Sequence, residues 1–252
     1  HSGDSACVLP PYLIGEEEQD TMRRHTVQLA EALGVDGLIN VQYAIKNGVV
    51  YVLEVNPRGS RTVPFVSKTI GVPLASIAAR VMAGEKLADI GFTEEIIPPY
   101  VAVKEAVFPF NKFREFDPIL GPEMRSTGEV MGTSESFGSA FYKAQLAADN
   151  GLPMTGAIFV SVNDSDKANV TPIVRRFYEM GFGIHATEGT GRHLRKLGIP
   201  VTRVYKVNEG RPHVIDLIVN RTVQLLINTP MGKRAQKDDY SMRQAAIAPQ
   251  DR

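Results

Sequence analysis

Beyond residue 151 the sequence alternates between short apolar runs and amphipathic stretches, and this rhythm restricts the possible folds more than any other feature. The apolar runs that suit strands are 157–162, 183–187, 201–206 and 223–228. The stretches that suit helices are 166–180, 191–197 and 212–219. Strands that alternate with helices form a parallel sheet with helices on its faces. We therefore predict a doubly wound α/β domain over residues 151–252, preceded by a boundary at the Gly- and Pro-containing stretch 149–153.

Residues 1–150 show a more mixed pattern, which predicts an α+β domain. We expect a helix from about residue 16 to residue 33, ended by Gly34, and a hairpin built from the apolar runs 37–45 and 49–55. The remaining expectations are a helix at 73–82, a strand at 101–110, a loop-dominated stretch at 117–132 and a helix at 134–148.

The charge balance argues against several classes of partner. The chain has 28 basic and 28 acidic residues, so it has no excess of basic residues that would indicate nucleic-acid binding. It also has no polybasic tract that would indicate binding to an anionic membrane surface. One cysteine, Cys7, excludes a disulfide framework within the chain and favours a cytoplasmic location. The chain starts at His1 within a turn-like stretch, which suggests a piece cut from a longer protein.

A candidate metal site lies on the predicted hairpin. Glu54 and Asn56 are two residues apart, so on a strand they share a face, and their oxygens suit Mg²⁺. Gln42 joins them only if the strand register has the right parity. A two-residue loop at 47–48 would place Gln42 on the opposite face, whereas a three-residue loop at 46–48, with Gly48 in a left-handed bulge, places it beside Glu54. We predict the three-residue loop; a surface hairpin with solvated polar groups is the alternative.

A second candidate site lies at the carboxyl edge of the predicted parallel sheet, where open α/β sheets bind their ligands. Hydroxyl, amide and lysine side chains follow the four predicted strands. The 189–191 turn, Gly-Thr-Gly, precedes a helix and presents backbone N–H groups to an anion. This pattern predicts a ligand that carries phosphate. Ordinary capping and turn chemistry uses the same residue types and is the alternative.

Several motifs carry a family resemblance. Residues 54–58, Glu-Val-Asn-Pro-Arg, resemble the metal-binding strand of the ATP-grasp ligases. The stretches 59–68 and 121–129, with the shorter 1–5 and 81–84, are similar to the large subunit of carbamoyl-phosphate synthase. Within that family the chain resembles the end of the second, carbamate-phosphorylating ATP-grasp domain, followed by a regulatory domain like methylglyoxal synthase.

The resemblance implies a ligase that uses ATP and two Mg²⁺ or Mn²⁺ ions. Gln42, Glu54 and Asn56 would hold the metals, and the first two would also contact the nucleotide. Arg58, and less strongly Arg61, would bind the transferring phosphoryl group. Two further residues that would contact the nucleotide are His1 and Ser2.

The resemblance also implies regulation and partners. A glutaminase small subunit would supply ammonia to the full large subunit, for pyrimidine and arginine biosynthesis, and a homo-oligomer is a further expectation. Nucleotides of the UMP or IMP class would bind at Ser161, Lys167, Thr187, Thr190, Lys206 and Asn228. Pro230 stands where relatives have a hydroxyl residue. Asp4 and Glu105 match positions that bind ornithine in some members.

Three alternatives stay open beside this interpretation. One is an effector-binding module without catalysis, and another is a different ATP-grasp carboxylate–amine ligase. A free-standing methylglyoxal synthase is disfavoured, because the sequence after Asn228, Thr-Pro-Met-Gly-Lys, lacks the catalytic aspartates of that lyase. Since the Gly-rich phosphate loop of an ATP-grasp site would precede His1, the 252-residue chain alone is expected to be inactive.

Overall fold

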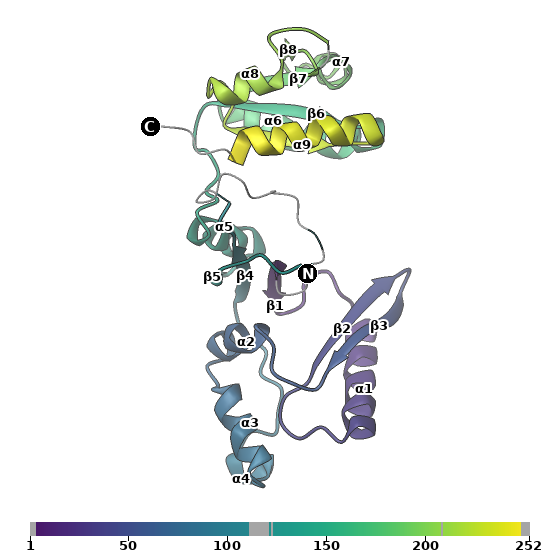
Figure 1. The fold of residues 1–252 in the computed structure, drawn as a ribbon, viewed down its shortest axis with the longest axis vertical. Helices are drawn as coiled ribbons and strands as arrows, with labels where there is room; N and C mark the ends of the chain where they lie inside the picture. The colour runs from purple at the N-terminus through teal and green to yellow at the C-terminus, as the bar shows by residue number, and fades with distance from the viewer. Residues whose placement is uncertain (1–3, 111–120, 122, 208, 248–252) are drawn as a thin grey trace. The chain divides into compact units, whose positions relative to one another are not determined.

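The structure, a computed structural model, describes residues 4–110, 121, 123–207 and 209–247 (Figure 1). The chain contacts divide it into two compact units. The first unit contains the described residues up to 107 and residues 124–151. The second contains the described residues of 108–123 and those from 152 onward.

In the first unit, α1 (Glu16–Leu33) lies against a hairpin of β2 (Asn40–Lys46) and β3 (Val49–Asn56) (Figure 1). The predicted bounds of this helix are confirmed. It ends at Gly34, whose left-handed φ of 59° lets its N–H reach the last carbonyl groups. The hydroxyl groups of Thr26 and Tyr43 are 2.7 Å apart and join the helix to β2.

The predicted three-residue hairpin loop is wrong. Lys46 pairs with Val49, which leaves the two-residue turn Asn47-Gly48, with φ values of 53° and 75°. Two residues with positive φ form the type I′ turn, which Asn-Gly favours because its twist matches that of the strands.

The register changes farther along the hairpin instead. Tyr43 pairs with Val52 but Gln42 pairs with Glu54, so Leu53 is an extra residue in β3. Such a β-bulge shifts the alternation of faces by one residue. The bulge therefore places Gln42 and Glu54 on one face of the hairpin, which is the effect expected of the three-residue loop.

Three helices follow the hairpin: α2 (Thr62–Ile70), α3 (Leu74–Met82) and α4 (Leu87–Ile90). The predicted helix 73–82 is confirmed to within one residue, whereas α2 and α4 were not expected. Proline at position 64 is tolerated in α2 because the first helical turn has no partner for its N–H groups. No single described helix is long and apolar enough to span a membrane, and α2 with α3 passes that test only as a bent pair.

A three-stranded antiparallel sheet completes this unit, in the order β1 (Cys7–Leu9), β4 (Val101–Val107), β5 (Gly128–Ser134). The expected strand at 101–110 is confirmed over 101–107. The expectation of a loop at 117–132 is wrong from Gly128 onward. Residues 121 and 123–127 form no helix or strand, as expected, whereas 117–120 and 122 lie outside the described residues. Helix α5 (Phe137–Ala147) packs on β4 and β5 and confirms the helix expected at 134–148.

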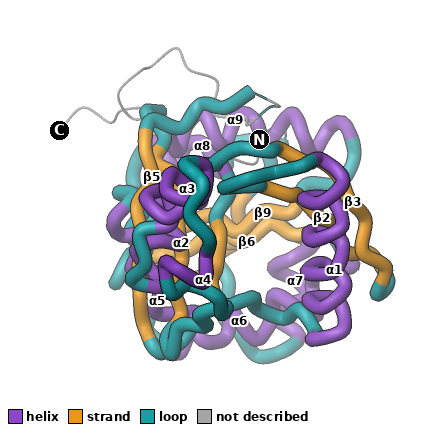
Figure 2. Tube along the Cα trace, turned by 90° about the horizontal axis from the view of Figure 1, so that it is seen from below, coloured by secondary structure: helices purple, strands orange, loops and turns teal. Residues whose placement is uncertain are grey.

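The second unit is the predicted parallel sheet. Its strands are β6 (Ala157–Val162), β7 (Gly183–Thr187), β8 (Thr202–Val204) and β9 (Leu225–Thr229), in the spatial order β8-β7-β6-β9. The bounds of β6 and β7 agree with the prediction. Strand β9 pairs with β6 on the side away from β7 (Figure 2).

Helices cover both faces of this sheet, as predicted for a doubly wound fold. The first face packs against α6 (Lys167–Glu179) and α7 (Glu188–Lys196) around Ile158, Val160 and Ile184. The second face packs against α8 (Val214–Val219) and α9 (Lys233–Ile247) around Phe159. Helix α7 starts three residues earlier than predicted, so Gly-Thr-Gly at 189–191 belongs to the helix and not to a preceding turn.

Candidate functional sites

The three predicted metal-binding side chains share one face of the β2–β3 hairpin. Gln42 is the direct partner of Glu54, and Asn40 is the direct partner of Asn56. Residues directly opposite each other in an antiparallel pair project from the same side, as do residues two apart on one strand. Gln42, Glu54 and Asn56 are therefore brought together, as the prediction required.

The chemistry of this face suits a hard divalent cation. The amide Nδ2 of Asn56 donates a hydrogen bond to Oε1 of Glu54, so the two side chains are in direct contact. Together with Gln42 they offer one carboxylate and two amide oxygens, which are ligands of Mg²⁺ and Mn²⁺. The described residues contain no group of three or more His, Cys, Asp or Glu side chains that could hold a metal ion. The charge of a metal ion on this face would therefore be neutralised largely by a ligand such as phosphate.

The segment after β3 is held to the hairpin by hydrogen bonds. The backbone N–H of Arg58 donates to the carbonyl of Asn56 at 2.8 Å, and its guanidinium donates to the carbonyl of Gly59 at 3.0 Å. The hydroxyl of Ser60 accepts hydrogen bonds from Nδ2 of Asn40 and the N–H of Thr62. Arg58 is exposed and follows directly on the metal-binding face.

The second candidate arginine is held differently. Nη1 of Arg61 donates to the Ser126 hydroxyl at 2.7 Å, which ties the start of α2 to the segment before β5. Asp4 accepts hydrogen bonds from the N–H groups of Arg125 (2.6 Å) and Ser126 (3.2 Å). His1 and Ser2, the other predicted nucleotide contacts, lie outside the described residues.

The two candidate ornithine residues have separate surroundings. Glu105 accepts hydrogen bonds from Nε2 of Gln145 on α5 (2.8 Å) and from the N–H of Ala106, and burial raises the pKa of its carboxyl. It does not pair with Lys104, which is buried and instead forms an ion pair with Glu129 at 2.8 Å. Each oxygen of the Asp4 and Glu105 carboxylates accepts a hydrogen bond within the chain, and their ornithine role stays a prediction.

A pocket of about 370 Å³ opens at the carboxyl edge of the parallel sheet. It includes four of the six predicted effector residues, which are Ser161, Thr187, Lys206 and Asn228. Strands β7 and β8 are added on one side of β6 and β9 on the other, so the order in which the parallel strands are added reverses between β6 and β9. Ligands of doubly wound folds bind at such a switch point.

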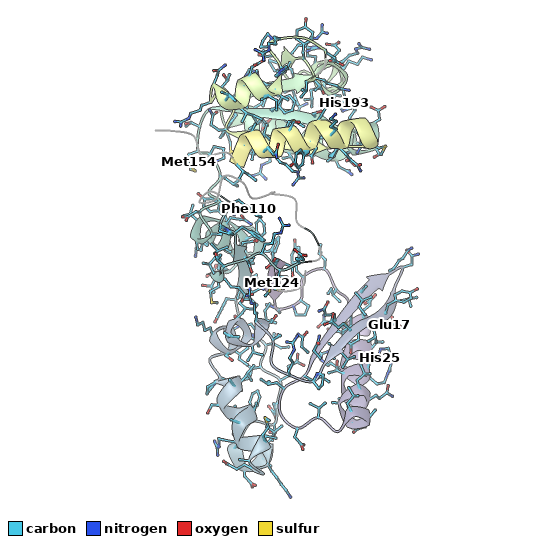
Figure 3. The ribbon with its side chains drawn as sticks, in the orientation of Figure 1. Glu17, His25, Phe110, Met124, Met154 and His193 are labelled. Carbon is cyan, nitrogen blue, oxygen red and sulfur yellow. The ribbon has the colours of Figure 1, made fainter. Side chains whose placement is uncertain are left out.

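The remaining two predicted effector residues do not line this pocket. Oγ1 of Thr190 is buried and bonds both the N–H and the carbonyl of Val162, so it joins α7 to the end of β6. Nζ of Lys167 forms an ion pair with Asp164 at 2.6 Å and lies close to Gly189 in the first turn of α7. The hydroxyl of Thr171 on α6 contacts Nε2 of His193 on α7 at 3.0 Å, and this links the two helices. His193 is labelled in Figure 3.

Helix α9 contributes pocket residues that the sequence interpretation missed. Asp238 and Met242 line the pocket, and Asp239 accepts a hydrogen bond from Nδ2 of Asn228 at 2.8 Å. The signal for this helix is weak, because most of its residues are polar. The lining also contains Pro230, which stands where relatives have a hydroxyl residue, and Glu209. The ionisable groups of the lining are therefore one base, Lys206, and two acids, Glu209 and Asp238.

Comparisons with known proteins match both parts of the chain to known families. Residues 1–90 match the family "Carbamoyl-phosphate synthase L chain, ATP binding domain", and residues 169–250 match the family "MGS-like domain". Similar curated proteins are the carbamoyl phosphate synthase large chains of Gemmatimonas aurantiaca (64% identical), Pasteurella multocida (56%) and Archaeoglobus fulgidus (54%). Each match covers 98% of this chain and 23% of the relative, so the chain spans about a quarter of their length. The chain therefore belongs to the carbamoyl phosphate synthase large-chain family.

Proposed function

We propose that this chain is part of a carbamoyl phosphate synthase large subunit and that the β2–β3 hairpin holds the metal–ATP complex that phosphorylates carbamate. The observation that carries the proposal is the register, which makes Gln42 and Glu54 direct partners and leaves Asn56 on their face. The match of residues 1–90 to an ATP-binding domain supports it.

In this proposal each side chain has a defined task. Gln42, Glu54 and Asn56 would hold two Mg²⁺ or Mn²⁺ ions, whose chemistry would be to neutralise phosphate charge. Arg58 and Arg61 bind the transferring phosphoryl group, for which a planar guanidinium offers paired donors. The face has a single carboxylate and therefore needs the negative charge that ATP brings.

The whole enzyme is proposed to act in the cytoplasm. It would take ammonia from a glutaminase small subunit and deliver carbamoyl phosphate to pyrimidine and arginine synthesis. The similar proteins are called large chains, and this name supports the existence of a smaller partner subunit.

The pocket of the second unit is proposed to bind a regulatory nucleotide. Lys206 and the hydroxyl groups of Ser161 and Thr187 offer donors to its phosphate. Glu209 and Asp238 would repel a phosphate, so they suit the sugar hydroxyls or base N–H groups at the other end of the ligand. The MGS-like match over residues 169–250 supports this assignment.

The metal assignment is tested by Asn56→Ala in the full-length enzyme. Removing one oxygen ligand should raise the Mn²⁺ concentration needed for half-maximal carbamoyl phosphate formation by about tenfold or more. Asn150→Ala, at an exposed asparagine of the same unit, is the matched control. An unchanged Mn²⁺ dependence in Asn56→Ala would remove this residue from the metal site.

The effector assignment is tested by calorimetric titration of the full-length enzyme with UMP and with IMP. Lys206→Gln should weaken binding of the active nucleotide by about tenfold, because one charge-assisted contact is lost. Lys196→Gln, at an exposed lysine near the end of α7, should bind like the unchanged enzyme. Equal affinities for Lys206→Gln and the unchanged enzyme would contradict the proposed pocket.

A further inference from the structure

Three segments that are distant in the sequence meet at Ser126. Nη1 of Arg61 donates to the Ser126 hydroxyl at 2.7 Å. The carboxylate of Asp4 accepts the N–H of Ser126 at 3.2 Å and the N–H of Arg125 at 2.6 Å. Asp4 thus holds the backbone that presents the Ser126 hydroxyl to the guanidinium.

The carboxylate at the inner end of this chain of hydrogen bonds is buried and charged. Asp4 is 8% exposed. Its burial raises the pKa, but hydrogen bonds from the Ser126 hydroxyl and from the N–H groups of Arg125 and Ser126 outweigh burial and lower the pKa. Two backbone N–H groups donate to this charged carboxylate, so the segment that carries the Ser126 hydroxyl is held by charge-assisted hydrogen bonds.

Arg61 is held from two directions. Its neighbour Ser60 accepts hydrogen bonds from Asn40 on β2 and from the N–H of Thr62, which fixes the backbone next to the metal-binding strands. Its exposed guanidinium donates to Ser126, and the described contacts give it no other side-chain hydrogen bond. A long arginine side chain has many rotamers, so an anchor that restricts them before the substrate binds favours the productive geometry.

We infer that Ser126 is a positioning residue for phosphoryl transfer and that it acts through Arg61, with buried Asp4 as its support. The inference rests on the proposed function, in which Arg61 contacts the phosphoryl group. The competing explanation is purely structural: Ser126 and Asp4 would only fasten the segment that leads into β5.

A double-mutant cycle in the full-length enzyme separates the two explanations. Ser126→Ala should lower kcat for carbamoyl phosphate formation about tenfold, with little change in the KM for ATP. In an Arg61→Ala background the same substitution should have no further effect, because Ser126 acts only through Arg61. Ser126→Thr, which keeps a hydroxyl, should restore most of the activity.

Asp4→Asn tests the other end of the chain and serves also if Ser126→Ala folds poorly. It should lower kcat in the same direction, and the loss should again vanish in the Arg61→Ala background. Ser139→Ala, at an exposed serine on α5, is the matched control and should leave kcat unchanged.

Two failures are distinguishable. If the losses from Ser126→Ala and Arg61→Ala multiply, or if Ser126→Ala keeps full kcat while Arg61→Ala does not, the positioning role is overturned and the proposed function stands. If Arg61→Ala itself keeps full kcat, the proposed role of Arg61 in phosphoryl transfer fails, and the role of Ser126 fails with it.

Discussion

Two carboxylates in the first unit, one buried and one partly buried, respond to pH in opposite directions. Burial raises the pKa of Glu105 above its ordinary value of 4.5. A raised pKa in the folded state means that the protonated form is favoured, so the stability from Glu105 is present below pH 4.5 and is lost as pH rises through the folded pKa. Glu105→Gln should therefore gain stability relative to the unchanged protein between pH 4 and pH 8, measured by thermal unfolding.

Asp4 provides the opposite case. Its pKa is lowered from 3.8, so its contribution is present above that value and is lost as pH falls through the folded pKa. Asp4→Asn should lower the unfolding temperature at neutral pH, and the deficit should shrink below about pH 4. Parallel pH profiles for Asp4→Asn and Glu105→Gln would contradict both assignments.

The buried ion pair of Lys104 and Glu129 gives a stability prediction. Glu129→Ala leaves a buried ammonium without its partner and should lower the free energy of unfolding by about 3 kcal/mol. The double variant Lys104→Met with Glu129→Leu replaces the pair by apolar groups of similar size and should lose much less. Chemical denaturation measures both, and equal losses would show that the pair is not the cause.

The residue-level assignments differ in how far the sequence could predict them. Glu54 and Asn56 follow from local spacing on one strand, so the sequence is sufficient. The contact of Arg61 with Ser126 joins residues 65 positions apart, and no local pattern encodes it. Thr190 was assigned to the effector through the family resemblance, and in the fold its hydroxyl bonds the backbone of Val162.

Among the elements, the β2–β3 hairpin places Gln42 beside Glu54 as predicted, but through a β-bulge and not through a longer loop. Gln42 and Glu54 share a face of the hairpin only if one extra residue lies between them, and we predicted this extra residue in the loop. Asn47-Gly48 instead forms the two-residue turn that its composition favours, and Leu53 provides the extra residue in a bulge. The preferences of Asn47 and Gly48 for positive φ determine the length of the loop, whereas the position of a bulge depends on packing against other elements.

Strand β5 carries a testable packing constraint. A Cβ on Gly132 would lie 2.4 Å from the carbonyl oxygen of Ala140 and 2.5 Å from the nitrogen of Ala144, so α5 lies directly on this glycine. Gly132→Ala should destabilise the protein by about 3 kcal/mol or more, because backbone atoms must move. Thermal or chemical unfolding measures the loss.

Gly138 is the matched control for that substitution. It lies inside α5, and a Cβ there meets nothing within 4 Å. Gly138→Ala should stabilise the protein by roughly 0.5–1 kcal/mol, through helix propensity alone. If both substitutions had the same sign, the close packing of α5 on β5 would be refuted.

At the scale of the whole molecule, the second unit was predicted well because short, mostly apolar strands alternate with helices. Its central strand β6 is a nearly continuous apolar run, which is typical of a parallel sheet covered on both faces. Helix α9 escaped prediction because its sequence is largely polar and only a few residues, such as Met242, reach the core. Strand β5 escaped because its glycines suggested a loop, although Gly132 serves close packing. The pocket at the sheet edge follows from topology, which the alternating pattern already implied.

The central claim is that the β2–β3 face holds the metal–ATP complex of the whole enzyme. The direct test is the rate of carbamoyl phosphate formation from ATP, bicarbonate and ammonia by the full-length enzyme carrying Glu54→Gln. The control is Glu31→Gln, at an exposed carboxylate on α1. Loss of the only carboxylate on the metal-binding face should lower the rate by about a hundredfold or more, while the control keeps its rate. A Glu54→Gln enzyme that works within about twofold of the control, a barrier difference of less than about 0.5 kcal/mol, would contradict the account.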